Sequence, residues 1–307
     1  MFKLIDEALF FFSRFRKYKT VKILPFYKYD NSVAFRKYLK GDCRWNLLKL
    51  VNGKFADFYI IINYPKRRIG FSYYNPKRTI ILQGEPKSTR LTWGKWGALA
   101  KNKFLSVFDI ENNRFGWSWQ ISKEYNFLVA EPIEKTKVIS TVLSNAYNLE
   151  GHRKRIDFLE FVDRRLDIDV YGRKNNYGKT TTKLFQFKNY KGCIVKKEEG
   201  LMPYKYVFVA ENSQEQNYFS EKINDAILCE CLCFYWGCPN LEQFIDTEAF
   251  IRLDLNSFEG SLKIINDAIE CKEWEKRISS IRREKNKILN KLQIMPTIEK
   301  IIKATQK

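Results

Sequence analysis

The sequence lacks a long uninterrupted apolar run. A membrane-spanning helix needs about 20 consecutive apolar residues. The nearest approach is Ala8–Phe12 (A-L-F-F-F), which follows Asp6 and Glu7 and comes just before Arg14. This stretch is too short for the apolar part of a secretory signal, and no small-residue cleavage site follows it. We therefore expect a cytoplasmic protein with neither a signal peptide nor a transmembrane span.

Histidine is nearly absent, which limits the metal sites that the chain can build. The only histidine is His152, and the chain has 7 cysteines. Four of these follow one another closely: Cys229, Cys231, Cys233 and Cys238. Zinc sites usually pair cysteines at C-x2–4-C with partners elsewhere, whereas this C-x-C-x-C pattern lies in an apolar run. We expect reduced thiols that pack as small apolar side chains, with a metal site as the less favoured alternative.

The chain also lacks the signatures of nucleic-acid-binding proteins. It has no zinc-finger spacing, RNP-like motif or recognisable helix-turn-helix. Its 55 Lys and Arg against 35 Asp and Glu give a net charge of +20. That charge is spread along the chain and suits nucleic acid, anionic lipid or phosphorylated ligands alike. We expect no nucleic-acid partner, and keep a nucleic-acid-binding module as a competing hypothesis that a steep salt dependence would reveal.

Short β-rich runs alternate with helical stretches over most of the 307 residues. This alternation predicts an α/β protein with largely parallel sheets and two domains. Strands are expected at 21–24, 58–62, 79–82, 105–108, 138–143, 167–171, 206–209, 232–236 and 250–253. Helices are expected at 31–39, 153–165, 219–228 and 258–269, and irregular structure at 112–134. The predicted domains are 1–136 and 137–272. The pattern of the second is typical of a nucleotide-binding domain with a doubly wound parallel sheet.

A basic tail over 273–307 completes the predicted organisation. Its composition favours helix, with a break at Pro296. Ile278, Ile281, Ile288 and Leu292 recur near helical spacing. The favoured interpretation is an amphipathic helix packed across both domains. The alternative is a peripheral contact with an anionic membrane surface through this basic tail.

The densest motif pattern lies between residues 204 and 254. It comprises Y-K-Y-V-F-V-A-E-N-S (204–213), N-Y-F-S-E-K (217–222), F-Y-W-G-C-P (234–239) and A-F-I-R-L-D (249–254). In order and spacing it resembles the C-terminal domain of the α-1,3-fucosyltransferases, glycosyltransferase family 10. Two further segments are similar to the family pattern, V-L-S-N (142–145) and I-D-V-Y-G (168–172). The similarity is weaker in a third, I-I-L-Q-G-E-P (80–86). Ala210 and Cys233 depart from the family pattern, where Phe and Pro are usual.

The resemblance implies a GT-B fold, in which two Rossmann-like domains face a cleft and the C-terminal helix packs back across both. It implies an inverting, metal-independent transferase that moves fucose from GDP-fucose to a hydroxyl of a glycan or glycoprotein acceptor. No cofactor is expected, because the nucleotide sugar is a substrate. A different donor such as UDP-xylose, or a non-catalytic nucleotide-sugar-binding protein, is the alternative. The N-terminal half barely matches the family, so acceptor and linkage stay open.

Transfer from a nucleoside diphosphate leaves negative charge on the departing diphosphate, which a cation must stabilise. Without a metal, this task falls to Lys and Arg. Lys222 in the S-E-K motif and Arg155, three residues before Phe158-Leu159, are the predicted catalytic cations, with Arg153 as a neighbour that could replace Arg155. The D-x-D pair Asp167 and Asp169 is the alternative metal-binding position.

The resemblance further implies which residues bind the donor and take the acceptor proton. The expected donor-binding residues are Ser144, Asn145, Asn212, Tyr218 and Glu221. Glu211 is expected to orient its neighbours rather than to touch the substrate.

Glu85, at the end of a predicted strand, is the expected general base. Glu111 and Glu131 are the fallback candidates for that role.

Overall fold

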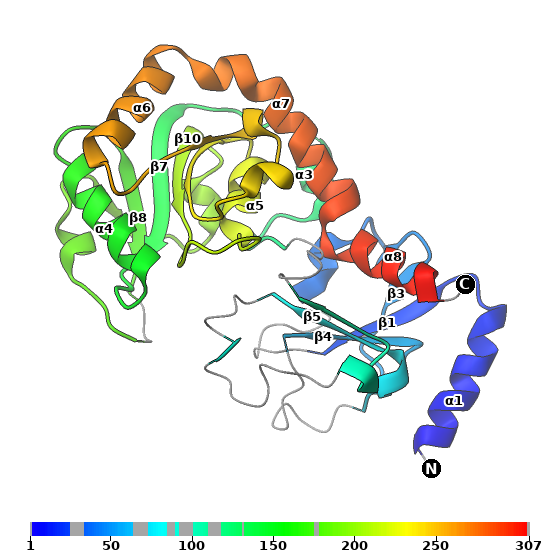
Figure 1. The fold of residues 1–307 in the computed structure, drawn as a ribbon. Coiled ribbons are helices and arrows are strands. Elements are labelled where there is room, and N and C mark those ends of the chain that lie inside the picture. Colours follow the sequence, from blue (N-terminus) through cyan, green and yellow to red (C-terminus); the bar gives the residue numbers. More distant parts are fainter. Residues whose placement is uncertain are drawn as a thin grey trace. The chain divides into compact units, whose positions relative to one another are not determined.

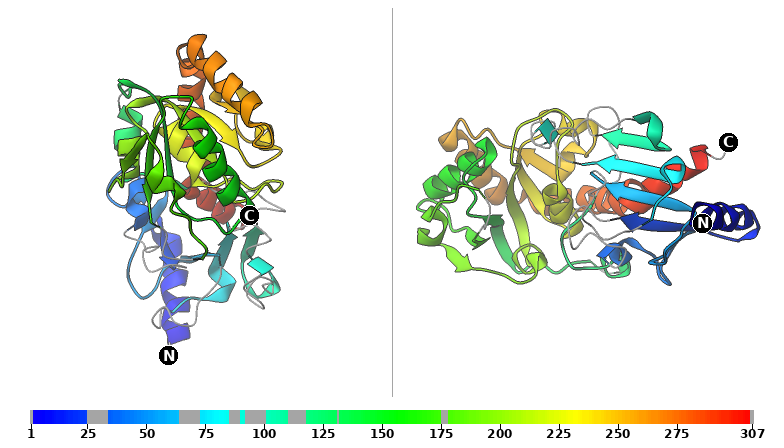
Figure 2. Two further views of the ribbon diagram at one scale, coloured as in Figure 1. Left: turned by 90° about the vertical axis from the view of Figure 1, so that its left-hand side faces the viewer. Right: turned by 90° about the horizontal axis from the view of Figure 1, so that it is seen from below.

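The computed structural model describes residues 2–24, 34–63, 73–84, 90–91, 101–109, 118–130, 132–174 and 178–305 (Figures 1 and 2). Contacts within the chain divide it into two compact units. The first contains Met1–Gly116, Glu124–Asn126 and Lys291–Lys307, and the second contains Trp117–Lys123 and Phe127–Asn290. The residues predicted as a separate tail are thus shared between the two units.

A mostly parallel sheet forms the centre of the first unit. Its strands are β1 (Lys19–Leu24), β2 (Arg44–Trp45), β3 (Leu48–Leu50), β4 (Phe58–Ile62), β5 (Thr79–Gln83) and β6 (Ser106–Asp109). Their order is β2-β3-β1-β4-β5-β6, and among these pairs only β2–β3 is antiparallel. Strands β4 and β5 each lie between two other strands and are apolar, β-branched runs that are buried almost throughout. Such runs are typical of parallel strands covered on both faces.

A second, parallel sheet forms the centre of the second unit. Its strands are β7 (Lys137–Ser144), β8 (Asp169–Arg173), β9 (Tyr190–Gly192), β10 (Tyr204–Ala210), β11 (Leu232–Trp236) and β12 (Phe250–Arg252). Their order is β12-β11-β10-β7-β8-β9. Counted along the chain from β7, this is the Rossmann order 3-2-1-4-5-6, read from the other edge. The order therefore reverses between β7 and β10, where such sheets bind their ligands.

Helices cover both faces of the second sheet (Figure 1). The helices of the described chain are α1 (Phe2–Phe12), α3 (Tyr125–Ala130), α4 (Glu150–Val162), α5 (Glu221–Leu228), α6 (Phe258–Glu270), α7 (Glu273–Lys287) and α8 (Ile294–Thr305). On one face, Phe158 of α4 packs edge-on against Phe208 of β10 and Phe258 of α6. Figure 1 shows α5 and α7 on the opposite face. Helices α4 and α5 each follow a strand of the pair at which the order reverses, so both begin at its carboxyl end.

The predicted strands all exist, and those at 58–62 and 232–236 agree to the residue. The predicted helix at 31–39 is wrong for its described part, which is a 3₁₀ turn over Ala34–Tyr38. The region predicted as irregular contains α3. Pro296 does not break the tail, because it lies in the first turn of α8, where its missing N–H has no helical partner anyway. The regular helix is interrupted earlier, by a π-helical turn over Ile288–Leu292.

The apolar residues of α8 are buried within the first unit. Ile294, Met295, Ile298 and Ile302 are at most 3% exposed. The amide of Gln293 donates to the Tyr38 carbonyl at 3.0 Å. The apolar surface that a membrane contact through this tail would need is therefore occupied by the protein itself. Within the residues that the structure describes, no helix combines the length and apolar composition needed to cross a membrane.

Candidate active site

A pocket lies beside β7 and β10, the strands at which the order of the second sheet reverses. Its lining residues are Thr141, Val142, Leu143, Arg155, Lys197, Leu201, Val207, Phe208, Val209, Ala210 and Lys222. The pocket brings together the two predicted catalytic cations, which are 67 residues apart in the sequence. It adds Lys197, which the sequence does not predict.

Lys222 is the second residue of α5 and is held by a carboxylate. Its Nζ lies 3.2 Å from Glu211 Oε2 and 2.8 Å from the hydroxyl of Ser220, which also caps the helix. Burial by itself would lower the pKa of Lys222, but the charges of Glu211 and Glu221 outweigh it and raise that pKa. The ammonium group is therefore kept cationic.

Glu211, which follows β10, fixes the start of α5. Its fully buried carboxylate accepts hydrogen bonds from the Ser220 N–H at 2.8 Å and the Ser220 hydroxyl at 2.6 Å, besides the contact with Lys222. Gly237 makes room for it, since a Cβ there would lie 2.6 Å from Glu211 Cγ. Glu211 thus holds Ser220 and Lys222 in place at the start of α5.

Arg155 projects from α4 and is only 5% exposed. Its guanidinium donates to the Ser144 hydroxyl at 3.4 Å and to the Asn212 side-chain oxygen at 3.5 Å, both neutral acceptors at long distances. Its Nε has no hydrogen-bond acceptor within the described part of the chain. Burial lowers the pKa of Arg155 to about 10, against the attraction of Glu211, so the group stays protonated at neutral pH.

His152 lies one turn before Arg155 on α4 and is also buried. Its Nε2 lies 3.0 Å from the side-chain oxygen of Asn212, and its Nδ1 lies 2.8 Å from that of Asn148. Burial and the positive charge of Arg155 lower the pKa of His152 to about 4. The imidazole is therefore neutral at pH 7. Sequence reasoning missed His152 as a site residue, although its being the only histidine was an available signal.

Tight packing of two backbones positions α4. The N–H of Gly151 donates to the carbonyl of Asn212 at 3.0 Å. A Cβ on Gly151 would lie 2.0 Å from the carbonyl oxygen of Glu211, so only glycine fits. Asn212 thus contacts α4 through Gly151 and Arg155, and Glu211 contacts Lys222 of α5. These two adjacent residues therefore fix the positions of Arg155 and Lys222 relative to each other.

The predicted donor-binding residues fall into two groups. Ser144 and Asn212 contact Arg155, as described above. Glu221 precedes Lys222, and although burial opposes ionisation, Lys222 and Lys197 lower the pKa of Glu221 to about 2. Tyr218 is 4% exposed and close enough to Arg155 to affect its pKa. These four residues surround the two predicted cations.

Asn145 contacts the backbone of the loop that follows β8. Its side-chain amide donates to the carbonyl of Thr181 at 2.9 Å, and its backbone carbonyl accepts from the Thr181 N–H at 3.0 Å. Asn145 therefore holds the loop after β8 in place.

Lys197 is a third cation in the pocket. Its Nζ lies 2.7 Å from Asp225 Oδ2, and Asp225 is fully buried on α5. Burial raises the pKa of Asp225, even though Lys197 and the Gln120 N–H oppose this. Lys197 could not be predicted from the sequence, because it lies in the charged run K-K-E-E and its partner is 28 residues away.

Glu85, the predicted general base, lies outside the described residues, as do Glu111 and Glu131. Arg153, the predicted substitute for Arg155, instead donates to the Asn148 carbonyl at 2.8 Å.

Asp169, one of the two carboxylates of the alternative metal position, is engaged in other contacts. Asp169 begins β8, at the opposite end of the strand from the ligand-binding edge. It accepts from the Tyr204 hydroxyl at 2.6 Å and pairs with Lys137 at 3.3 Å. Cys229, Cys231, Cys233 and Cys238 are buried and are not in disulfide bonds, as expected for small packing residues. No group of three or more His, Cys, Asp or Glu suited to a metal ion occurs among the described residues.

The charges of the pocket suit a multiply charged anion. Lys222 and Lys197 are each paired with a carboxylate, whereas the hydrogen bonds of Arg155 within the described part of the chain go to neutral oxygens. None of the described residues that line the pocket carries a carboxylate. A guanidinium can bind two oxygens of a phosphate group at once, and the N-terminus of α5 adds N–H groups and a favourable dipole.

Comparison with known proteins agrees with this geometry. Residues 132–267 match the family described as glycosyltransferase family 10 (fucosyltransferase), C-terminal domain. Over 73 residues the chain is 32% identical to alpha-(1,3)-fucosyltransferase FucT of Helicobacter pylori, a match that covers 24% of this chain and 15% of that protein.

Two solved structures share the fold. A crystal structure of an α1,3-fucosyltransferase with GDP has a TM-score of 0.51 and 14% identity over 92% of this chain and 93% of that one. An α-glucosyltransferase solved with UDP and a 13-mer DNA has a TM-score of 0.55 and 11% identity, covering 99% of this chain and 94% of that one. The predicted GT-B fold is thereby confirmed. The predicted resemblance is confirmed for the second half of the chain, since residues 132–267 match the C-terminal domain of glycosyltransferase family 10, the fucosyltransferases.

Proposed function

We propose that the chain transfers fucose from GDP-fucose to a hydroxyl group of a glycan or glycoprotein, with inversion at the sugar carbon and without a metal ion. The observation that carries this proposal is Arg155, a buried cation whose hydrogen bonds to other described residues are long and go to neutral oxygens. Leaving such a charge uncompensated is costly. A diphosphate bound beside it would supply the missing negative charge.

In the proposed reaction, the acceptor oxygen attacks C1 of the sugar while the bond from C1 to the diphosphate oxygen breaks. The electron pair of that bond goes to the diphosphate, whose charge increases. Arg155 would bind diphosphate oxygens through two N–H groups, and Lys222 would act as a point charge. Interactions that strengthen as this charge develops lower the barrier. The acceptor proton would pass to a carboxylate, for which Glu85 remains our proposal, and a single displacement inverts C1.

The described residues that line the pocket do not form a typical Mg²⁺ or Mn²⁺ site. These ions prefer carboxylate and other oxygen ligands, whereas the charged side chains that line the pocket are Arg155, Lys197 and Lys222. This supports a mechanism in which side chains do the work of the metal.

The choice of GDP-fucose rests on the family match and on the α1,3-fucosyltransferase solved with GDP. A UDP sugar is the second candidate, because the similar α-glucosyltransferase was solved with UDP. We further propose a cytoplasmic enzyme with no nucleic-acid partner.

Thermal unfolding in the presence of EDTA tests the donor class. Samples with GDP, GDP-fucose, UDP, UDP-xylose or no ligand are compared at about 100 times a micromolar Kd, where a bound ligand adds about 2.7 kcal/mol. We expect GDP and GDP-fucose to raise Tm by several degrees and the UDP compounds to have little effect. A response to UDP compounds alone would transfer the proposal to a UDP sugar, and no response to any of them would contradict it. Binding without turnover of GDP-fucose over a panel of glycan acceptors would indicate a non-catalytic binding protein.

A further inference from the structure

Helix α1 presents its apolar side chains to solvent. Nearly half of the large apolar side chains that are exposed in the described chain belong to residues 2–15. The most exposed are Leu4 (72%), Phe12 (63%) and Phe15 (80%), and Ile5, Leu9 and Phe11 are 41–53% exposed. In the helix, positions 4, 5, 8, 9, 11 and 12 share one face. We call the five exposed large apolar residues at these positions (Leu4, Ile5, Leu9, Phe11 and Phe12), together with Phe15 of the 3₁₀ turn that follows the helix, the outer face of α1.

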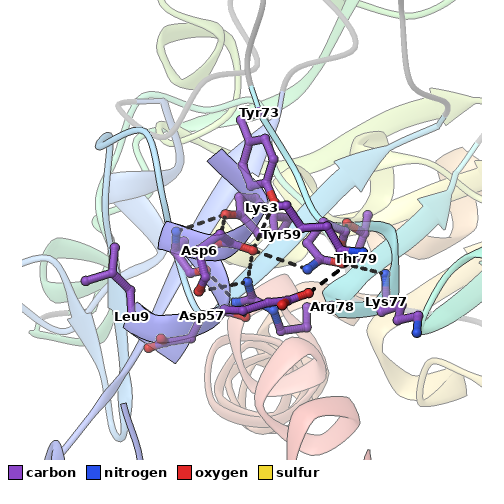
Figure 3. Close-up of polar contacts among 12 residues, drawn as sticks. Lys3, Asp6, Leu9, Asp57, Tyr59, Tyr73, Lys77, Arg78 and Thr79 are labelled. Carbon is purple, nitrogen blue, oxygen red and sulfur yellow. Dashed lines mark hydrogen bonds and ion pairs between the residues drawn. The ribbon is translucent and has the colours of Figure 1, made fainter. Parts of the chain in front are cut away.

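The opposite side of α1 is attached to the rest of the first unit mainly through polar groups. A surface helix usually buries its apolar side chains and exposes its polar ones, whereas α1 does the reverse. Asp6 is 1% exposed and accepts hydrogen bonds from the Tyr59 hydroxyl at 2.8 Å and the Asn75 amide at 3.2 Å, and it forms an ion pair with Arg78. Figure 3 shows Asp6 pointing into this cluster, while Leu9 on the same helix extends away from it. Phe10 adds an edge-on contact with Phe58.

Further contacts fix the orientation of α1. Arg78 also donates to the Asp57 carbonyl at 2.7 Å. Arg16, just after the helix, donates to the Asp57 carboxylate at 2.6 Å. Because breaking a buried ion pair is strongly unfavourable, α1 cannot easily turn to bury its outer face against its own unit.

Basic residues flank the outer face. Lys3, Arg14, Arg16 and Lys17 are exposed, whereas of the two acidic residues of α1, Asp6 is buried and only Glu7 is exposed. A second copy of the chain placed on this face would bring like charges together. An anionic lipid surface would meet both the apolar side chains and the positive charge, and α1, with 11 residues, suits a helix lying in the interface rather than one spanning it.

We propose that the outer face of α1 docks the protein on anionic phospholipid membranes, with α1 lying in the membrane surface. This contact is additional to the proposed transferase reaction and does not depend on it. It replaces the basic tail as the membrane-contacting element, since the apolar side of α8 is buried.

Flotation of the full chain with vesicles tests the proposal. We expect binding to vesicles of equal parts phosphatidylcholine and phosphatidylglycerol, weaker binding to pure phosphatidylcholine, and weakening by salt. The double variant Leu4→Ser/Phe12→Ser should lose at least about tenfold in vesicle affinity, because each removed side chain contributes a large part of a buried apolar group. The matched control Val195→Ser/Ile264→Ser, with exposed apolar residues of the second unit, should bind like the parent chain.

A second pair of variants tests the charge. Arg14→Gln/Lys17→Gln should reduce binding to the anionic vesicles by about fivefold for each residue and leave binding to phosphatidylcholine unchanged. Lys300→Gln/Lys303→Gln, which removes the same charge from α8, should have little effect. An unchanged midpoint of urea unfolding would show that each variant is folded.

Three outcomes would overturn the proposal. The first is no binding of the intact chain to anionic vesicles. The second is undiminished binding of Leu4→Ser/Phe12→Ser. The third is a chain that ignores vesicles but forms a dimer in solution that this double variant abolishes, which would assign the outer face to self-association.

Discussion

Arg155 and Lys222 carry the same charge but are held in different ways. Lys222 has a carboxylate partner 3.2 Å away, in Glu211, and its raised pKa reflects that partner. Arg155 is more deeply buried and contacts neutral oxygens. A bound diphosphate would therefore compete with Glu211 for Lys222. At Arg155 it would instead supply the negatively charged hydrogen-bond acceptors that the neutral oxygens do not provide. For this reason we expect Arg155 to contribute the larger share of donor affinity.

His152 should report on this positive environment, and it is the only histidine in the chain. Its pKa is lowered from 6.5 to about 4, so the folded protein resists protonation over a range where the unfolded chain accepts a proton. The stability that depends on a neutral His152 is complete above pH 6.5 and is lost as the pH falls to about 4. The loss amounts to about 3 kcal/mol at 1.36 kcal/mol per pKa unit.

An NMR titration of the His152 Cε1 proton measures this pKa directly. We expect a midpoint near 4 in the folded protein, an upward shift when GDP binds beside Arg155, and a value near 6.5 in urea. A folded-state midpoint near 6.5 would contradict the burial and charge that we describe. His152→Gln is the control, since it should flatten the dependence of unfolding free energy on pH in this range.

At the scale of elements, α4 is placed by the close approach of Gly151 to residues 211 and 212. Gly151→Ala would put a methyl carbon 2.0 Å from the Glu211 carbonyl oxygen, so α4 must shift. We expect a loss of about 1–3 kcal/mol in unfolding free energy, as for other overpacked sites, and weaker GDP binding because Arg155 moves with the helix. Gly53→Ala, which meets nothing closer than 3.8 Å, is the control. Urea unfolding and GDP titration of both variants check this, and equal behaviour of the two would refute the packing account.

The attachment of α1 is the second prediction at this scale. Asp6→Asn keeps the size of the side chain but leaves Arg78 as a buried, unpaired cation, so we expect a loss of about 3–5 kcal/mol in the stability of the first unit. Glu7→Gln, the neighbouring exposed residue on the same helix, should change stability by less than about 0.5 kcal/mol. Urea unfolding distinguishes the two, and a mild effect of Asp6→Asn would mean that the ion pair does not fix α1.

The sequence predicted some elements better than others for physical reasons. Strands β4 and β11 are continuous apolar runs, which is what burial on both faces requires. Helix α1 was not predicted, because its buried residue is an aspartate and its apolar residues point outward. In the site, Lys222 and Arg155 were predicted from the motif resemblance. Lys197 was not, because a partner distant in the sequence holds it in the pocket.

For the whole molecule, the division into two units predicts a local response to the donor. The pocket and the residues that surround it lie in the second unit. Hydrogen exchange with and without GDP should therefore show added protection in peptides covering 141–155 and 197–222. Strands β4 and β5 of the first unit should change little with GDP alone. Protection confined to the first unit would place the nucleotide elsewhere.

The account depends most on two side chains binding a diphosphate without a metal, and calorimetric titration with GDP in excess EDTA tests this directly. We predict that the parent chain binds GDP under these conditions. Arg155→Met and Lys222→Met should each weaken binding by about 10- to 100-fold, as expected for lost charge-assisted hydrogen bonds. Lys205→Met, which removes a lysine paired with Glu275 outside the pocket, should bind like the parent. GDP binding that requires Mn²⁺, or that neither Arg155→Met nor Lys222→Met weakens, would contradict the account.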